Sequence, residues 1–203
     1  MASINIIKQY FPNLTVQQQN LLVAYQKQLL HINENINLIS RKDVDNFEVH
    51  HLLHSLAIAK VINFKPNKKA VDIGTGGGLP GIPLAILFPK TEFLLVDAIE
   101  KKTKAVSKIV QNLNLPNVKV QHVRAEKLKT KFDYVLSRAV TQLPKLLVWS
   151  KKLLKDLKDS KIIMLKGGDL NKETENLNYA FQTTAISNFF IEDFFNEKYI
   201  III

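Results

Sequence analysis

The sequence predicts a doubly wound α/β domain with a mostly parallel β-sheet, placed behind an N-terminal helical extension. Short apolar runs recur between residues 65 and 203, and helix-length segments separate most of them. That alternation is typical of βαβ units. A glycine cluster follows the first run, at the position where such folds bind ligands. Apolar residues in the first part of the chain instead follow helical spacing. We therefore expect two parts, residues 1–64 and residues 65–203.

The N-terminal part is expected to contain two helices. Thr15–Gln18 has the sequence of a capping box, and apolar residues follow it at helical spacing as far as Ile32. The acidic segment Asp43–Asp45 precedes a second helix, expected over residues 46–62. Residues 64–67 are predicted to form the turn that ends this part.

The second part is expected to contain a seven-stranded sheet. Five apolar runs are candidate parallel strands: Ala70–Ile73, Phe93–Val96, Val118–Val120, Tyr134–Leu136 and Ile162–Leu165. Helices are expected over Glu100–Leu113 and Thr141–Lys155. Residues 185–203 have no helical period, and we expect two strands there, joined near Asn196 and Glu197. They would form an antiparallel hairpin at one edge of the sheet.

Composition excludes several classes of function. The 203 residues include no cysteine, which rules out a disulfide framework, a zinc ribbon, an iron–sulfur cluster and a thiol nucleophile. The net charge is +10, with 7 basic against 4 acidic residues in positions 1–68 and 21 against 14 in the remainder. This excess favours a polyanionic partner, nucleic acid before membrane, although lysines at helical spacing can equally be ordinary solvent-facing residues. No apolar run is long enough to span a membrane and no secretory leader is visible, so we expect a cytoplasmic protein.

The segment Asp72–Gly81, DIGTGGGLPG, carries the most information. It follows the first predicted strand, where glycines let the backbone approach a ligand closely. Residues 76–81 match the dinucleotide pattern G-x-G-x-x-G, but that match starts after Gly74 has already begun the turn. Counted from the strand end, residues 72–78 are an acid followed by G-x-G-x-G, which resembles the first motif of S-adenosylmethionine methyltransferases. A carboxylate there suits a cationic ligand better than a pyrophosphate.

Two further segments suit an adenosine-containing cofactor. Asp97 ends the second predicted strand, about 20 residues after the glycines, where a carboxylate can accept hydrogen bonds from both ribose hydroxyls. Arg124–Glu126 follows the third predicted strand, beside the place of the adenine in this fold. Both features also fit NAD, so an NAD(P)-dependent Rossmann oxidoreductase stays open as an alternative.

If the ligand is a methyl donor, the absence of certain residues and motifs reduces the number of possible methyl-acceptor atoms. Methylation at pyrimidine C5 needs a cysteine nucleophile, and the chain has none. The Asn/Asp-Pro-Pro-aromatic motif of exocyclic amino methyltransferases is also missing, since Leu136–Ala139 is LSRA. A ring nitrogen such as guanine N7 needs only positioning, desolvation and in-line approach, because it has no proton to lose. Methylation of a ring nitrogen therefore remains open.

Five segments resemble the 16S ribosomal RNA guanine-N7 methyltransferase G family (RsmG, also called GidB). They are Asn37–Leu38, His51–Leu56, Asp72–Leu84, Ser137–Ala139 and Leu165–Gly167. The G-G-L-P-G-I-P continuation is far more specific than the general methyltransferase loop. The resemblance implies a Rossmann-like class I methyltransferase fold, S-adenosyl-L-methionine as methyl donor and a guanine in the decoding region as acceptor. We expect a monomer whose partner is 16S rRNA or the small ribosomal subunit.

The resemblance also implies site residues. Those that would bind the cofactor are Asp72, Gly74, Gly76, Gly78, Leu79, Asp97, Ala125, Glu126 and Arg138. Those that would be catalytic are Arg138, Lys166 and His51. Those that would bind RNA are Asn37, Arg41, His51 and Lys166. The cations would contact a phosphate or guanine O6 rather than act as bases.

Two positions depart from the family pattern, and two alternatives remain. Where the family has a Trp-Asn pair, this chain has Ile32–Asn33, and where the family has an aspartate, this chain has His54. His50 and His54 share a helix face, but no third ligand is evident, so we expect no metal. Arg138 could instead pair with Asp97 or Asp133. A non-catalytic rRNA-binding assembly factor that keeps the glycine loop is the remaining alternative to an enzyme.

Overall fold

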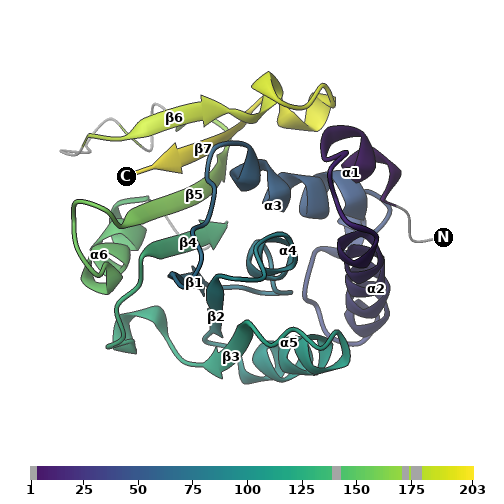
Figure 1. Ribbon diagram of the computed structural model, residues 1–203, viewed down its shortest axis with the longest axis horizontal. Helices are drawn as coiled ribbons and strands as arrows, with labels where there is room; N and C mark the ends of the chain where they lie inside the picture. Colours follow the sequence, from purple (N-terminus) through teal and green to yellow (C-terminus); the bar gives the residue numbers. More distant parts are fainter. Residues whose placement is uncertain (1–3, 139–142, 171–173, 175–179) are drawn as a thin grey trace.

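A seven-stranded sheet forms the centre of the computed structural model, which describes residues 4–138, 143–170, 174 and 180–203 (Figure 1). The strands are β1 (Lys69–Ile73), β2 (Glu92–Asp97), β3 (Val118–His122), β4 (Tyr134–Arg138), β5 (Lys161–Gly167), β6 (Gln182–Ala185) and β7 (Lys198–Ile202). Their order is β3-β2-β1-β4-β5-β7-β6. β7 is antiparallel to both of its neighbours, whereas β1 to β5 are parallel. The predicted mostly parallel sheet with a C-terminal antiparallel hairpin is confirmed.

The hairpin does not have the predicted boundaries. Its first strand, β6, ends at Ala185, where the prediction had it begin, and residues 186–195 contain two 3₁₀ turns instead. The side chains of Phe190 and Phe195 are fully buried, and the Phe190 ring lies 4.7 Å from that of Tyr10. The apolar residues of this segment therefore pack against the N-terminal helices, and they do not pair as a strand.

Six α-helices are described: α1 (Asn5–Tyr10), α2 (Val16–Asn33), α3 (His54–Leu56), α4 (Gly81–Leu87), α5 (Glu100–Asn112) and α6 (Leu143–Leu153). A π-helical turn over Glu48–Leu53 and a 3₁₀ turn over Ala57–Lys60 make α3 part of one continuous helical segment, as predicted. The capping box is confirmed, because the Thr15 hydroxyl accepts from Gln18 N at 3.2 Å and Thr15 N donates to Gln18 Oε1 at 3.0 Å. Helix α1 was not predicted. The start predicted for the helix over 141–155 lies outside the described residues.

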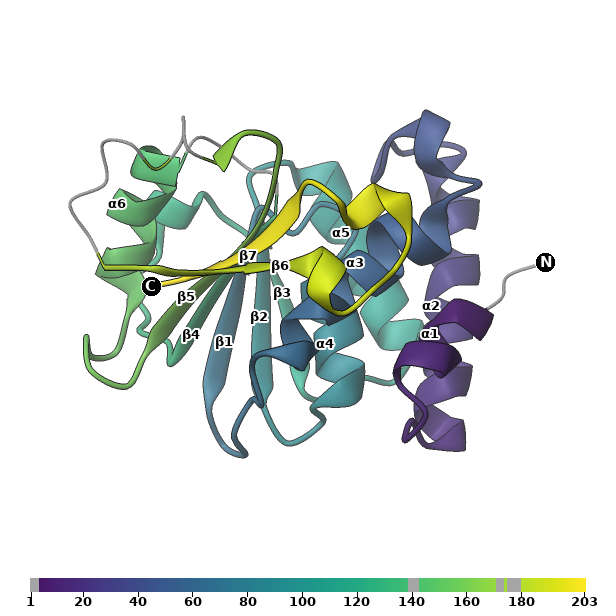
Figure 2. The ribbon, with the colours of Figure 1, turned by 90° about the horizontal axis from the view of Figure 1, so that it is seen from above.

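The helices form two layers on opposite faces of the sheet. α2, α3, α4 and α5 lie on one side and α6 lies on the other (Figure 2). On the first side one apolar core joins residues of the extension, such as Leu29 and Leu52, to residues of the sheet domain, such as Ile82 and Leu95. On the other side Val71 and Val135 share a core with Leu146 of α6. The extension therefore completes one face of the sheet core, and this places it beside the glycine loop.

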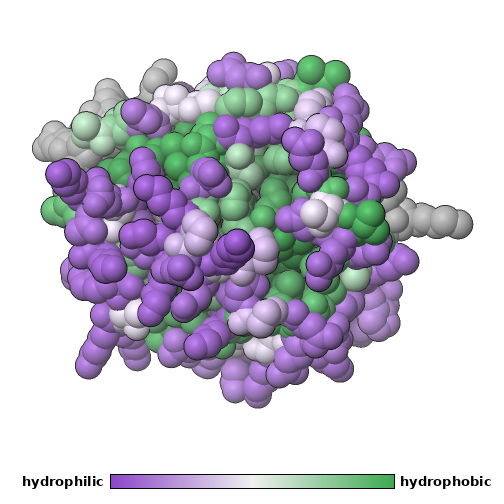
Figure 3. Space-filling view, in the orientation of Figure 1, coloured by the Kyte–Doolittle hydropathy of each residue, from purple (hydrophilic) through white to green (hydrophobic). Residues whose placement is uncertain are grey.

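Hydrophilic side chains cover most of the face shown in Figure 3, with hydrophobic surface in the hollows between them. Among the described residues, no helix combines the length and the apolar character that crossing a membrane requires.

Candidate functional site

The glycine loop leaves the carboxyl end of β1 and leads into α4. Gly74, Gly76 and Gly78 have φ values of +67°, +57° and +92°, a region that residues with a Cβ rarely adopt. Thr75 N donates to Val96 O at 3.0 Å, which ties the loop to the neighbouring strand β2. The glycines that sequence reasoning singled out are thus required by the backbone path itself.

Asp72, the last residue but one of β1, holds the loop from below. It is fully buried, and its Oδ2 accepts hydrogen bonds from the Thr75 hydroxyl at 2.6 Å and from Gly81 N at 3.0 Å. Oδ1 is also buried and has no partner among the described residues. Burial raises the pKa of Asp72 to about 6. One oxygen therefore organises the loop, and the other is left for a group that the protein does not supply.

Asp97, at the carboxyl end of β2, lies against the same loop. Its Oδ2 accepts from Gly76 N at 3.0 Å and its Oδ1 accepts from Ile99 N at 2.9 Å. The side chain therefore fixes both the glycine loop and the entry to α5. Two acids that sequence reasoning chose for the cofactor are brought to one edge of the sheet, although binding of a ribose by Asp97 stays a prediction.

The extension also contacts the glycine loop directly, which sequence reasoning missed. The hydroxyl of Tyr25, on α2, donates to Gly77 O at 2.9 Å, and Tyr25 is fully buried. A Cβ at Gly77 would lie 2.9 Å from Leu29 Cδ1, so α2 packs on the loop without a gap. The helical spacing identified Tyr25 as a core residue, but spacing carries no information about where a hydroxyl donates.

Asn33 explains why half of the Trp-Asn pair is retained. Its Oδ1 accepts from Leu38 N at 2.8 Å and Ile39 N at 3.0 Å. The carbonyl oxygen of Leu38 in turn lies 3.6 Å from the position of a Cβ on Gly76. The segment after α2 is therefore folded over the glycine loop by a single buried amide.

Arg138, at the carboxyl end of β4, contacts a histidine of the extension. Its Nη1 lies 3.1 Å from His51 Nδ1 and donates to His50 O at 3.4 Å. In the described part of the chain no carboxylate lies within ion-pair distance of Arg138, and Asp133 pairs instead with Lys68 at 2.8 Å. Burial lowers the pKa of the guanidinium, but a group with so high a starting pKa stays charged. Arg138 is therefore a partly buried cation without an acidic partner.

His51 is neutral in this environment. Burial, together with the charge of Arg138, lowers its pKa to about 3. The pKa of the neighbouring His54 is also well below its usual value, mainly because of burial, and its ring packs against Phe194 and Phe195. In the part of the chain that the structure describes, no group of three or more potential ligands is placed to hold a metal ion.

The remaining predicted site residues range from buried to exposed. Ala125 is buried and Glu126 exposed in a 3₁₀ turn after β3. Leu79 is buried in the apolar core, and Lys166, near the end of β5, is partly buried opposite Tyr199 of β7. Asn37 and Arg41 are exposed. Within the described ranges no hydrogen bond or ion pair joins either of them to the Arg138–His51 pair.

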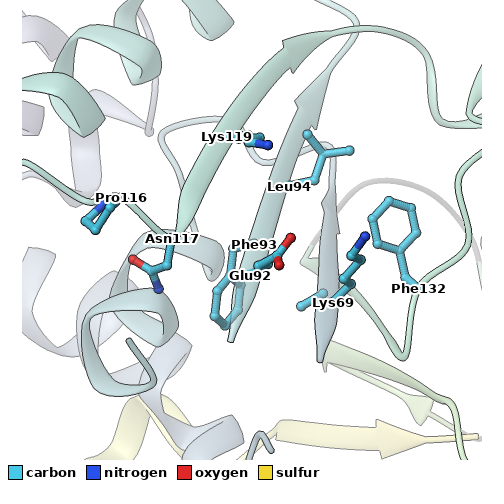
Figure 4. Close-up of a pocket in the computed structure, with 9 residues that line it drawn as sticks. Lys69, Glu92, Phe93, Leu94, Pro116, Asn117, Lys119 and Phe132 are labelled. Atoms are coloured by element: carbon cyan, nitrogen blue, oxygen red, sulfur yellow. The ribbon is translucent and has the colours of Figure 1, made fainter. Parts of the chain in front are cut away.

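A hollow of about 330 Å³ lies at the opposite, amino ends of β1, β2 and β3 (Figure 4). Lys69 and Glu92 begin their strands there, and Phe132 precedes β4. The amide of Asn117 donates to the carbonyl oxygens of Ala85 and Thr91, both at 3.1 Å. This amide therefore serves the local fold, and ligands of parallel α/β sheets bind at the other edge.

Sequence comparison places this architecture among rRNA-modifying proteins. The family described as rRNA small subunit methyltransferase G (GidB) matches residues 18–201. The ribosomal RNA small subunit methyltransferase G of Phocaeicola vulgatus is 45% identical over 202 residues, covering 98% of this chain and 97% of the relative. The protein of the same name from Flavobacterium johnsoniae is 46% identical over 202 residues, covering 96% and 95%.

Solved structures support the fold. A SAM-dependent methyltransferase from Aquifex aeolicus superposes with a TM-score of 0.59 at 13% identity, covering 81% of this chain and 97% of that one. A fibrillarin/Nop5p complex gives a TM-score of 0.55 at 11% identity, covering 71% and 77%. Identities this low show the Rossmann-like fold alone.

Proposed function

Since this chain belongs to the rRNA small subunit methyltransferase G family, we propose that it transfers a methyl group from S-adenosylmethionine to N7 of a guanine in the decoding region of 16S rRNA. The observation that carries the proposal is the set of buried polar groups at one edge of the sheet. Among the described residues, Asp72 Oδ1 has no hydrogen-bond partner and Arg138 has no acid within ion-pair distance. Both lie where the strands adjoining the glycine loop end.

The residues at this edge fit a cofactor that carries both cationic and anionic groups. The buried oxygen of Asp72 suits a cationic group, and the guanidinium of Arg138 suits a carboxylate or an electron-rich base. The glycines leave room for the cofactor to approach the backbone of the loop closely. Asp97, at the end of β2, would accept hydrogen bonds from the ribose hydroxyls. Ala125 and Glu126 follow β3 and would flank the adenine. When bound, S-adenosylmethionine supplies an electrophilic methyl group.

The chemistry proposed for this site needs no general base. Guanine N7 has a free lone pair and loses no proton on methylation, so the protein has only to position the base and exclude water. His51 is consistent with this, because a histidine with a pKa near 3 has little affinity for a proton at neutral pH. Arg138 and Lys166 would hold guanine O6 or a phosphate, which orients N7 while keeping their charge away from the positive charge that develops on the methylated ring.

The excess of basic residues in positions 69–203 supports an RNA partner. Asn37, Arg41 and Lys166 would contact the RNA around the site, and the enzyme would act as a monomer on 16S rRNA or the small subunit. Phosphate contacts release counterions, so binding should weaken steeply with salt. RNA binding that changes little between 50 and about 200 mM salt contradicts this part of the proposal.

The test is to incubate the protein with tritiated S-adenosylmethionine and small ribosomal subunits that lack the mark, and then to map the label on the RNA. We expect one labelled guanine in the decoding region, methylated at N7. Label on another nucleotide or on protein overturns the substrate. Thermal stabilisation by NAD but not by S-adenosylmethionine supports an oxidoreductase instead. RNA binding without methyl transfer supports an assembly factor.

A further inference from the structure

Asp43 lies beside two histidines of the extension, His50 and His51, close to the candidate site. It ends the 3₁₀ turn Arg41–Asp43 that precedes the helical segment of His50 and His51. Its Oδ1 lies 3.1 Å from His50 Nδ1, and its Oδ2 lies 3.9 Å from His51 Nε2. The Asp43 side chain is 38% exposed, whereas that of His51 is 9% exposed. The carboxylate is therefore more open to solvent than the imidazole of His51 that it faces.

The hydrogen-bonding capacity of Arg138 fixes the tautomer of His51. A guanidinium has only donors, so His51 Nδ1, 3.1 Å from Arg138 Nη1, has to accept. A neutral imidazole that accepts at Nδ1 carries its hydrogen on Nε2. That N–H is buried and has no hydrogen-bond partner within the described ranges. The nearest carboxylate oxygen recorded for it is Asp43 Oδ2.

We propose that Asp43 is a positioning residue of the methyl-transfer site. Its carboxylate attracts the Nε2–H of His51 and accepts from His50, and His51 in turn holds the guanidinium of Arg138. Within the described residues both hydrogen bonds of Arg138 come from Nη1, and its other N–H groups would hold the cofactor or the base. This inference rests on the proposed function, because a fixed Arg138 matters only if that side chain binds a reactant.

A simpler role for Asp43 is to start the helical segment. An aspartate at a helix start stabilises it by accepting from backbone N–H groups or by facing the helix dipole. In the described part of the chain, however, the hydrogen bond of the Asp43 carboxylate is to the imidazole of His50. Aromatic rings also contact the two imidazoles. His50 stacks on Phe194 with 3.9 Å between ring centroids, and the ring centroids of His51 and Phe47 are 5.6 Å apart. The contacts therefore converge on the orientation of the rings.

The first test compares Asp43→Ala with Asp45→Ala, which removes the same charge from an exposed position two residues on. Rates are measured with tritiated S-adenosylmethionine and small subunits that lack the mark. We expect kcat to fall roughly 10- to 100-fold in Asp43→Ala, because misplacing a reactant-binding group by about 1 Å can cost that much, and to stay unchanged in Asp45→Ala. A lower KM for subunits at unchanged kcat would indicate only lost repulsion of RNA and overturns the inference.

The conservative variant Asp43→Asn separates orientation from charge. Its amide oxygen can accept from one imidazole, but its NH₂ group cannot accept from the other. We expect a kcat between those of the wild type and Asp43→Ala. We expect the melting temperature of Asp43→Asn to equal that of the wild type. A kcat no higher than that of Asp43→Ala contradicts the orienting role.

A second measurement does not depend on activity. Ring nitrogen shifts of His51, assigned by loss of its signals in His51→Gln, report the tautomer of the unaltered protein by NMR. We expect the hydrogen on Nε2, and the Nδ1–H tautomer overturns the inference. Absence of methyl transfer by the unaltered protein removes the proposed function instead, and the tautomer result still stands.

Discussion

The two ends of the central sheet differ in whether their buried polar groups have partners in the protein. At the amino end the Asp133 carboxylate accepts hydrogen bonds from Lys68 Nζ and from Lys69 N, each at 2.8 Å. At the carboxyl end, within the described ranges, Asp72 has one buried oxygen without a partner, and Arg138 contacts a neutral histidine and no acid. An unpaired buried polar group costs about 1–3 kcal/mol, so the unpaired oxygen of Asp72, at the edge of the sheet where ligands bind, is a candidate ligand contact.

The comparison also shows what the shape of the surface fails to indicate. Hollows of about 330 Å³ and about 500 Å³ lie at the amino end and beside Gly168 and Tyr199, and the glycine loop lines neither of them. The carboxyl end is identified by unsatisfied donors and acceptors around the glycine loop. Variants at matched positions of the two ends can therefore test whether function follows the unpaired groups.

Arg138→Ala should have the largest effect. We expect turnover to fall by about 10²–10³-fold or more, the usual cost of losing a donor that contacts the reacting groups, while the fold remains. Lys69→Ala removes an exposed cation at the amino end of β1 and should leave turnover within about twofold. Steady-state methyl transfer measures both. Wild-type turnover in Arg138→Ala would contradict the role assigned to this residue.

Asp97→Ala should weaken cofactor affinity more than turnover. Hydrogen bonds to a charged group contribute about 1.5–3 kcal/mol, so we expect the Kd for S-adenosylmethionine to rise roughly 10- to 100-fold by calorimetry. At saturating cofactor, kcat should change only a few-fold. Glu92→Gln, at the other end of the same strand β2, is the control. An equal loss in both variants would mean that the affinity does not depend on the carboxyl end.

Sequence reasoning was sufficient for features encoded by local pattern. The capping box and the glycine loop both follow from residues that act through the backbone, such as Gly74 and Thr15. Their conformational preferences are the same in any protein. The location of site residues at strand ends follows from the parallel sheet itself, since ligands bind at its carboxyl edge.

Contacts between distant segments could not be obtained in this way. The bond from Tyr25 to Gly77 joins residues 52 positions apart, and a hydroxyl on an apolar helix face gives no sign of its acceptor. The position of β6 was wrong because the aromatic residues around Phe190 were interpreted as a strand, whereas they fill the space beside Tyr10. Both features depend on tertiary packing, which overrides local preference.

Asp72→Asn should change the pH dependence of stability. Folding raises the pKa of Asp72 from 3.8 to about 6, so the native state binds this proton more tightly and loses stability as the pH rises from about 4 to 6. His51, whose pKa is lowered to about 3, acts in the opposite direction, because its contribution is lost as the pH falls below 6.5. The difference between Asp72→Asn and the wild type isolates the first effect.

At pH 7.5 we expect Asp72→Asn to be more stable to urea than the wild type by roughly 1–3 kcal/mol, with the advantage lost at pH 4. Its affinity for S-adenosylmethionine should fall, because the amide cannot attract a cationic group. Asp133→Asn, at the amino end, breaks the pair with Lys68 and should destabilise the protein at pH 7.5. A gain of stability in both variants would remove the distinction between the two ends.

Tyr25→Phe should give the smallest effect, and it tests whether the extension belongs to the carboxyl-end site. The change removes one hydroxyl and its bond to Gly77 O, so the peptide group of the loop is no longer held. Losing one hydrogen bond costs about 1 kcal/mol, or roughly fivefold in Kd for S-adenosylmethionine. Tyr10→Phe is the control, because its hydroxyl accepts from Ile191 N at 3.0 Å and donates to Glu192 Oε1 at 3.1 Å, away from the glycine loop. A purely structural role of the Tyr25 hydroxyl predicts equal cofactor affinities in the two variants. A weaker affinity in Tyr25→Phe alone makes α2 part of the wall of the cofactor site, because only this variant loses the bond to the glycine loop.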